Sequence, residues 1–499
     1  MMEMNNRPML NLYPDSLGSR LSEAVAFLSR PELKDAFGSV YVLPSLYHSD
    51  LDRGFCVVDY DLNEELASPQ DVADLKALGL DLKLDFVLNH ASVQSPQFQD
   101  LLRKGEDSEY RDFFIDWNQF WQGRGEMTPE GYIQPEKQYL SQMFFRKPGL
   151  PILMVRFPDG REVPYWNTFY QKVWEEAGER RYLGQMDLNI RSEKVWAFYD
   201  QTLAKLASYG ARIIRLDAFA YAPKAPGKRN FMNEPETWET LARVRELADG
   251  YGLRLLPEIH AGYEEQVYRK IADQGYMTYD FFLPGLILDA IENHTGAYLA
   301  AWAREQEEQG IRTVNMLGCH DGIPLLDLKG LLPDERIQGL IDLTVARGGY
   351  VKNLHGAKNM YYQVNATYFS ALGESEEKME LARAIQLFMP GKPQVWYLDL
   401  LCGKNDYAAM ERAGEGGHKE INRTNLSLAE AEGRLENPCV RKQLELLRLR
   451  STHPAFGAES RVRAEAEGAE LRLVWENGPH RAELQAHLDT GKYEIIQRG

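Results

Sequence analysis

The segments Arg215-Leu216-Asp217, Pro257-Glu258-Ile259-His260 and Cys319-His320-Asp321-Gly322 decide the fold predicted for this chain. Each follows an apolar run typical of a β-strand, over residues 211–216, 253–256 and 313–318 respectively. A carboxylate therefore stands at the end of three strands, and the stretches between them have a helical pattern. One such segment could be an ordinary loop. Three of them, 41 and then 63 residues apart, predict one catalytic edge of a parallel sheet.

The same alternation of strands and helices continues over the rest of the chain. Apolar runs predict five more strands, over residues 9–13, 39–44, 82–89, 276–283 and 394–398. Amphipathic patterns predict helices over residues 69–78, 193–209, 234–251, 266–275 and 376–388. Eight strands with helical partners predict an α/β protein built on a (β/α)8 TIM barrel, whose catalytic groups stand at the carboxyl ends of the strands.

Two interruptions and a tail divide the predicted barrel. Residues 91–183 are rich in aromatic, charged and turn residues, and a bare loop of this length would be improbable, so they predict an inserted subdomain B. Residues 322–373 predict a second insertion, B'. The barrel itself is expected in three parts, over 1–90, 184–321 and 374–456. Alternating runs predict a small C-terminal β domain over 457–499.

The composition is that of an ordinary globular protein, with 44% hydrophobic and 11% aromatic residues in a chain of 499. A net charge of -17 argues against nucleic acid or an anionic membrane as a partner. The four cysteines form no CxxC or His-rich metal pattern, which indicates reduced thiols. Without a signal-peptide pattern or a run of 18 apolar residues, a soluble cytoplasmic protein is expected, with neither a metal nor an organic cofactor.

Further motifs accompany the three opening segments. They are Asp52-Arg53-Gly54-Phe55, Asn89-His90, Gln185-Met186-Asp187-Leu188-Asn189, Tyr362-Gln363-Val364-Asn365, Gly403-Lys404-Asn405-Asp406 and Ile421-Asn422-Arg423. Together the motifs resemble those of the α-amylase superfamily of retaining glycoside enzymes, over nearly the whole chain. The last three favour its sucrose phosphorylase group.

The resemblance implies a catalytic set of three carboxylates. Asp217 would be the nucleophile that forms a covalent β-glucosyl ester, kept ionised by Arg215 two residues earlier on the same face of the strand. Glu258 would protonate the leaving oxygen and then assist the incoming acceptor. Asp321 would stabilise the distorted sugar by binding its hydroxyls.

The resemblance also implies the residues that bind the substrates. Asp52 and Arg423 would close a pocket for one glucosyl unit, and Phe55 would give the sugar an apolar platform. Other contacts with the sugar are expected from His90, Arg215, His260, His320 and Gln363. On the side of the acceptor, where inorganic phosphate is the expected co-substrate, the candidates are Arg146, Tyr362, Lys352 and His355.

Departures from the family pattern leave the leaving group open. A basic stretch with Arg347, Lys352, His355 and Lys358 predicts contact with an anionic leaving group, although such charges also suit a solvated loop. Arg53 resembles the form found in sucrose 6'-phosphate phosphorylases. Further departures are Asp399 in place of a usual Gly, and Lys419-Glu420 in place of a usual Arg-Asp.

The sequence therefore predicts a retaining α-glucoside phosphorylase that releases α-D-glucose 1-phosphate from sucrose or a sucrose-like donor. Fructose, fructose 6-phosphate, glycerol and glycerate are all open as leaving groups, and a homodimer is possible. An α-glucosidase or transglucosidase is the nearest alternative, because the shared motifs do not encode the use of phosphate. A non-catalytic sugar-binding protein would have to lack one of Asp217, Glu258 and Asp321.

Overall fold

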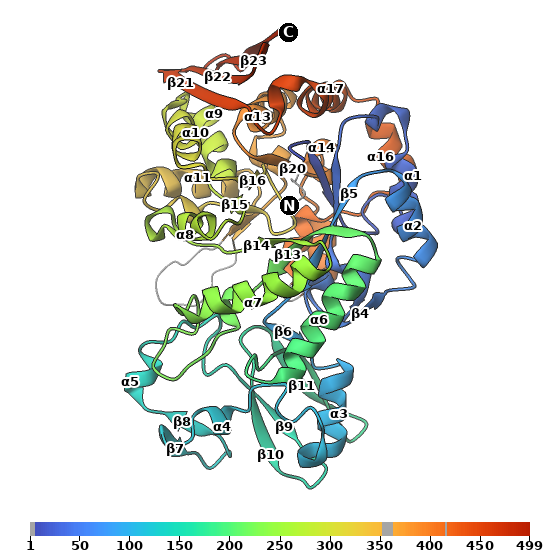
Figure 1. Cartoon of the computed structure of the whole chain (residues 1–499), viewed down its shortest axis with the longest axis vertical. Helices are drawn as coiled ribbons and strands as arrows, with labels where there is room; N and C mark the ends of the chain where they lie inside the picture. The colour runs from blue at the N-terminus through green and yellow to red at the C-terminus, as the bar shows by residue number, and fades with distance from the viewer. Residues whose placement is uncertain (1–4, 352–362, 415–416) are drawn as a thin grey trace. The chain divides into compact units, whose positions relative to one another are not determined.

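A computed structural model describes residues 5–351, 363–414 and 417–499 (Figure 1). Its largest sheet has eight strands in the order β14-β13-β5-β2-β1-β20-β16-β15. In chain order these are β1 (Met9–Leu12), β2 (Ser39–Val42), β5 (Asp81–Val87), β13 (Ala211–Asp217), β14 (Arg254–Pro257), β15 (Thr278–Asp280), β16 (Thr313–Asn315) and β20 (Lys392–Trp396). The strands run parallel and form a nearly closed barrel, which confirms the predicted fold.

The barrel strands are short and apolar because a parallel sheet is buried on both faces. Every residue of β1, β2, β16 and β20 is buried. The predicted strand over 276–283 is too long, since the Asp280 carboxylate accepts hydrogen bonds from the backbone N–H groups of Phe282 (3.2 Å) and Leu283 (3.0 Å) and so starts helix α9 (Leu283–Asn293). The strand predicted over 394–398 is also wrong in extent, because helix α14 (Tyr397–Leu400) begins inside it.

The chain divides into two compact units. Unit 1 consists of Met1–Val42, Glu65–Leu82 and Ile259–Gly499, and unit 2 of Leu43–Glu64 and Lys83–Glu258. Strands β13 and β14, and β5 from Lys83 onward, belong to unit 2, and the other five barrel strands to unit 1. Asp217, which ends β13, and Glu258, which follows β14, therefore belong to the same unit.

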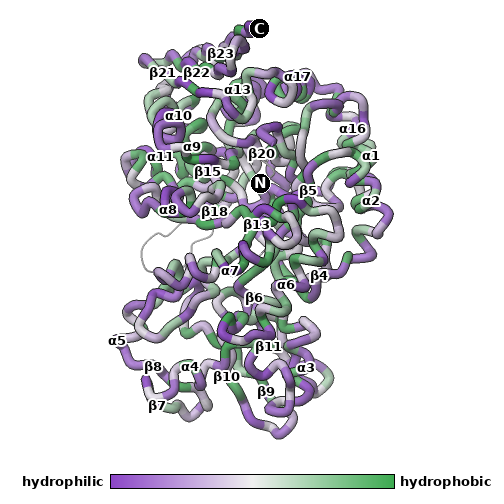
Figure 2. Tube along the Cα trace, viewed as in Figure 1, coloured by the Kyte–Doolittle hydropathy of each residue, from purple (hydrophilic) through white to green (hydrophobic). Residues whose placement is uncertain are grey.

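Unit 2 is built from helices α3 (Pro96–Lys104), α6 (Glu193–Ser208) and α7 (Glu236–Gly250) and from several small antiparallel sheets. The hydropathy along α6 changes from residue to residue, as Figure 2 shows, because one helical face is buried through Val195, Tyr199 and Leu206. A second apolar core forms around Trp117, Trp121 and Trp166. Aromatic residues that interrupt the barrel pattern in the sequence thus form a packed core.

Unit 1 contains the predicted helix over 376–388, present as α13 (Glu376–Phe388), whose first turn is capped by the Ser375 hydroxyl. The chain ends in an antiparallel sheet of four strands, in the region where the sequence predicts a small β domain. The strands are β21 (Arg461–Glu467), β22 (Glu470–Asn477), β23 (His480–His487) and β24 (Lys492–Arg498). The Trp475 indole N–H donates to the backbone oxygen of Phe388 (2.7 Å), which ties this sheet to α13.

All four cysteines are buried and free, and the sulfur atoms of Cys402 and Cys439 lie 3.4 Å apart. Within residues 5–351, 363–414 and 417–499, no helix is both long and apolar enough to cross a membrane. Nor do the described residues contain a group of three or more His, Cys, Asp or Glu side chains that could hold a metal ion.

Candidate active site

The carboxylates of Asp217 and Glu258 both contact one buried guanidinium in unit 2. Arg215 stands two residues before Asp217 on β13, and alternate residues of a strand face the same side. Its Nη1 lies 3.0 Å from Asp217 Oδ1 and 2.6 Å from Asp85 Oδ1, and its Nη2 lies 3.1 Å from Glu258 Oε1. Arg215 is 3% exposed, so these charges interact with little screening by water. One forked cation therefore positions both carboxylates.

Phe55, His90 and Gln185 form a buried group beside this arginine. The Arg215 guanidinium carbon lies 5.3 Å from the centre of the Phe55 ring. The backbone oxygen of Phe55 accepts hydrogen bonds from His90 Nε2 (3.0 Å) and Gln185 Nε2 (3.2 Å). Burial lowers the pKa of His90, which favours the neutral ring at neutral pH. The structure thus brings Phe55, His90 and Arg215 together, and their binding of a sugar stays a prediction.

Asp52 lies on a tight turn that precedes Phe55. Asp52, Arg53 and Gly54 all have positive φ angles, of 46°, 50° and 117°. A side chain at Gly54 would lie 2.2 Å from the backbone N of Ser45, so only glycine fits there. Consecutive non-glycine residues in this conformation are costly, and such strain is concentrated at functional sites. Asp52 itself is exposed.

The Lys224 ammonium lies among three oxygen atoms next to His90. Its Nζ lies 3.0 Å from Asn89 Oδ1, 2.7 Å from Asp187 Oδ2 and 2.6 Å from the backbone oxygen of Tyr221. Burial lowers the pKa of Lys224, and the Asp187 carboxylate opposes that shift. Carboxylate, amide and carbonyl oxygens are ligands that calcium prefers, but here a lysine satisfies them. Lys224 belongs to no strand-end motif, so the sequence does not single it out.

Three basic side chains, Arg146, Lys147 and Lys224, line one small pocket in unit 2. Its other polar lining comes from Thr168, Tyr221 and Asn230. Burial lowers the pKa of Lys147 to about 8 although the Asp187 charge opposes it, and its ammonium donates to Asn167 Oδ1. Arg146, which the sequence predicts, therefore has an unpredicted basic neighbour. The two side chains suit an anion.

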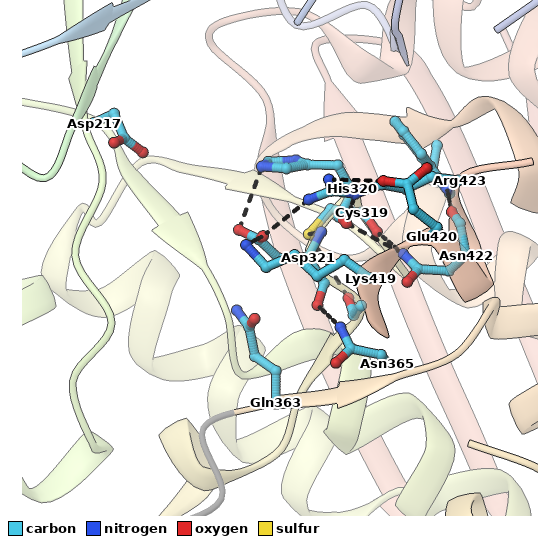
Figure 3. Close-up of polar contacts among 12 residues, drawn as sticks. Asp217, Cys319, His320, Asp321, Gln363, Asn365, Lys419, Glu420, Asn422 and Arg423 are labelled. Carbon is cyan, nitrogen blue, oxygen red and sulfur yellow. Dashed lines mark hydrogen bonds and ion pairs between the residues drawn. The ribbon is translucent and has the colours of Figure 1, made fainter. Parts of the chain in front are cut away.

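The cluster around Asp321 in unit 1 is shown in Figure 3. Lys419 Nζ lies 2.9 Å and Arg423 Nη2 3.6 Å from Asp321 Oδ1, and His320 Nε2 lies 3.3 Å from Oδ2. Burial raises the pKa of Asp321, but His320, Lys419 and Arg423 outweigh it and hold that pKa well below its ordinary value. Asp321 is therefore an anion at neutral pH.

Neighbouring residues fix the chain around Asp321. Asn422 Nδ2 donates to the backbone oxygen of Cys319 (2.9 Å), and Arg423 Nε donates to that of His320 (2.8 Å). Asp399 accepts a hydrogen bond from the backbone N–H of Gly318 (3.0 Å), and burial raises the pKa of Asp399 to about 6. A Cβ at Gly318 would lie 2.7 Å from Asp399 Oδ2. The unusual Asp399 thus supports the segment that carries Asp321.

His260 and Gln363 contact each other elsewhere in unit 1. The His260 ring stacks on Phe281 with centroids 3.8 Å apart, and its Nδ1 lies 3.3 Å from both carboxylate oxygens of Asp327. Nδ1 therefore donates to Asp327, and Nε2 lies 3.3 Å from Gln363 Nε2. Gln363 opens strand β19 (Gln363–Asn365), so two predicted sugar-binding residues meet here.

The predicted acceptor residues are only partly within the described structure. Lys352, His355, Lys358 and Tyr362 lie outside the described residues. Arg347 is wrongly assigned to the basic loop, because its guanidinium forms a two-pronged ion pair with Glu292 (2.9 and 3.0 Å) and donates to the Ala371 oxygen. The Arg347 guanidinium therefore links the C-terminal end of α9 to the backbone at Ala371.

Comparisons with known proteins agree with the geometry. Residues 37–285 match a family model described as the alpha amylase catalytic domain. The chain is 56% identical to a sucrose 6(F)-phosphate phosphorylase of Ilumatobacter coccineus, covering 98% of this chain and 95% of that protein. It is 35% identical to a sucrose phosphorylase of Streptococcus mutans, covering 99% and 98%. The crystal structure of a sucrose 6F-phosphate phosphorylase from Thermoanaerobacter thermosaccharolyticum superposes with a TM-score of 0.89 at 34% identity, covering 99% and 96%.

Proposed function

Because the chain belongs to the α-amylase family and, within it, to the group of sucrose phosphorylases, we propose that it cleaves a sucrose-like α-glucoside with inorganic phosphate and releases α-D-glucose 1-phosphate. The observation that carries this proposal is Arg215, whose guanidinium contacts the carboxylates of both Asp217 and Glu258. Two carboxylates within reach of one side chain supply the nucleophile and the acid/base of a retaining mechanism.

In the first half-reaction Asp217 attacks the anomeric carbon of the donor, and the bond from that carbon to the leaving oxygen breaks. Glu258 gives its proton to the departing oxygen. The products are the free leaving group and a β-glucosyl ester on Asp217. Arg215, 3.0 Å from Asp217, favours the ionised form that attacks.

In the second half-reaction a phosphate oxygen attacks the anomeric carbon, and the ester bond to Asp217 breaks. Glu258, now ionised, takes the proton that the phosphate loses. Two inversions at the same carbon restore the α configuration. We assign Arg146 and Lys147 to attracting the phosphate, since both basic side chains line one pocket of unit 2.

The glucosyl unit is bound by hydroxyl contacts and by one aromatic face. Asp321, with His320 and Arg423, binds ring hydroxyls, and the ionised state of Asp321 supports this role. The other assigned contacts come from side chains that the sequence analysis selects: Asp52, Phe55, His90, His260 and Gln363. Hydrogen bonds from such groups strengthen as the ring distorts toward the transition state, which lowers the barrier.

Sucrose 6'-phosphate is the donor that we favour. Its support is the Arg53 form of the Asp52–Phe55 motif, the basic residues Lys352 and His355 in the sequence, and the 56% identity to a protein of that name. Unphosphorylated sucrose is the second candidate, supported by the S. mutans relative. Glucosylglycerol and glucosylglycerate are further alternatives. A cytoplasmic location and a homodimer stay predictions.

The test is release of α-D-glucose 1-phosphate from sucrose, sucrose 6'-phosphate, glucosylglycerol and glucosylglycerate, each with and without phosphate. We expect product only with phosphate and the highest kcat/KM for sucrose 6'-phosphate. Release of free glucose at the same rate without phosphate would make the protein a hydrolase instead. Because we propose no metal or organic cofactor, dialysis against a chelator is expected to leave the rate unchanged.

A further inference from the structure

Lys419 makes the shortest of the three contacts that reach the Asp321 carboxylate. Its Nζ is 2.9 Å from Oδ1, whereas Arg423 Nη2 is 3.6 Å from the same oxygen and His320 Nε2 is 3.3 Å from Oδ2 (Figure 3). A separation of 2.9 Å is that of a close ion pair, whereas at 3.6 Å the Arg423 nitrogen is near the outer limit of one. Among the described residues, Lys419 is therefore the cation nearest to the Asp321 carboxylate.

The segment that carries Lys419 is anchored to the backbone that carries Asp321. Lys419 belongs to a short 3-10 helix, Gly417–Asn422, in which Ile421 and Asn422 are buried. The Asn422 amide donates to the backbone of the segment that bears Asp321, and the Ile421 oxygen accepts from Asp406 N at 2.8 Å. The helix that supplies the cation is thus tied to the same backbone as the anion.

Two other groups hold Arg423 at its longer distance from Asp321. Its Nε donates to the His320 backbone oxygen at 2.8 Å, and its Nη1 lies 3.3 Å from Glu420 Oε1. Turning Arg423 toward Asp321 would break both contacts. The Lys419 side chain is 26% exposed and that of Asp321 16%, so their ion pair is shielded far better than a surface pair, which is typically worth little.

We propose that Lys419 is a positioning residue, whose ammonium holds Asp321 ionised and oriented to meet the hydroxyls of the glucosyl unit. The proposal rests on the function proposed above. Asp321 contacts the sugar in that function, and Lys419 acts on the sugar through Asp321. Loss of one charged contact to a partly buried carboxylate corresponds to a roughly ten- to hundred-fold effect.

Two consequences separate this role from simple packing. The charged groups that surround Asp321 are His320, Lys419 and Arg423, with Glu420 paired to Arg423. Removing Lys419 takes away one cation, so Asp321 becomes easier to protonate and activity should be lost at a higher pH as the solution is acidified. Because hydroxyl contacts strengthen in the transition state, kcat should fall as well as KM rise.

The experiment uses α-D-glucosyl fluoride as donor in the presence of phosphate, since fluoride leaves with little help from an acid and kcat/KM then reports the first half-reaction without the natural leaving group. We expect Lys419→Met to lower kcat/KM by roughly ten- to a hundred-fold and to move the acid side of its pH profile upward. Lys419→Arg, which keeps the charge, should stay within about three-fold of the unaltered protein. Lys442→Met is the matched control, because Lys442 forms an exposed pair with Glu445.

A double-mutant cycle shows whether Lys419 acts through Asp321. Binding of the cationic glucose mimic 1-deoxynojirimycin is measured by calorimetry for Lys419→Met, Asp321→Asn and the double variant. We expect Lys419→Met to weaken binding when Asp321 is present and to change it less than about three-fold in the Asp321→Asn background. Should Lys419→Met lower the melting temperature by several degrees, Lys419→Gln replaces it.

The proposal is overturned if the loss is the same with and without Asp321, if Lys419→Arg is as poor as Lys419→Met, or if Lys419→Met has no effect. The function itself fails separately. In that case the unaltered protein releases fluoride but makes no α-D-glucose 1-phosphate from any natural donor.

Discussion

Replacement of Arg215 by lysine is expected to remove the contact with the Glu258 carboxylate while keeping a cation beside Asp217. Asp85 and Asp217 share the Nη1 atom of the guanidinium, at 2.6 and 3.0 Å, but Glu258 contacts Nη2, at 3.1 Å. A lysine has one nitrogen and can replace only one arm of this fork. The lost contact is a charge-assisted hydrogen bond worth about 1.5–3 kcal/mol, or a roughly ten- to hundred-fold change in rate.

This loss should depend on how much the leaving group needs a proton. Sucrose 6'-phosphate and sucrose need the acid, whereas α-D-glucosyl fluoride needs it little, so kcat/KM should fall far more for the sugars than for the fluoride. The assay is initial rates with both kinds of donor. Arg161→Lys is the control, because Arg161 is 56% exposed and pairs with Asp159 at the surface. Equal losses on both donors, or no loss at all, would refute the idea that Arg215 positions the acid.

Four further predictions concern single residues. Asp217→Asn should lower turnover by several orders of magnitude and abolish the glucosyl-enzyme adduct in mass spectra, since an amide cannot form the ester. Glu258→Gln should cripple the use of sucrose-type donors but spare the first step with α-D-glucosyl fluoride, as measured by fluoride release. Gly318→Ala should cost about 1–3 kcal/mol in urea unfolding, because the new methyl group would meet Asp399 at 2.7 Å. The pKa of Lys147 is about 8, below the ordinary 10.5, so its ammonium is lost as pH rises through about 8; KM for phosphate should rise there in the unaltered protein but not in Lys147→Arg.

The pH dependence of stability at Lys147 has the opposite sign to that of phosphate binding. Between about pH 8 and 10.5 the folded side chain is neutral while the unfolded one is charged, so the unfolded state binds more protons. Stability therefore rises with pH across this window, whereas the attraction for phosphate falls. Urea unfolding and phosphate kinetics measured on the same samples separate the two effects.

The parts of the fold that could be predicted from the sequence are those with a local cause. Helix α13 has the predicted bounds because Ser375 caps it and its apolar face has a regular period. The start of α9 could not be predicted, because the apolar run continues past Asp280 and only the hydrogen bonds of that carboxylate end the strand. The end of β20 could not be predicted for a similar reason, since the sequence remains apolar up to residue 398, after the backbone has turned into α14.

The carboxylates of the candidate site could be predicted, but most of their cations could not. Arg215 precedes Asp217 by two residues, so the alternation of one strand reveals the pair. Lys419 reaches Asp321 from 98 residues further along the chain, and Lys224 reaches Asn89 from 135 residues away. Arg347 shows the converse error, because a basic stretch does not reveal that Glu292 already neutralises one of its members.

A common physical requirement connects these cases. A carboxylate that ends a buried barrel strand is desolvated, and it stays ionised only if a cation comes close to it. The cation beside Asp217 is Arg215, which belongs to the same strand and is therefore close to it in the sequence. The cation beside Asp321 is Lys419, which belongs to a short helix after the last barrel strand. The catalytic acids of such a barrel are therefore local features of the sequence, but the groups that keep them ionised need not be. Asp321 lies six residues beyond the end of β16, and the residue two positions before it is Cys319 rather than an arginine. For such a carboxylate, a distant lysine or arginine should be sought first among the residues that bind the backbone of the same segment.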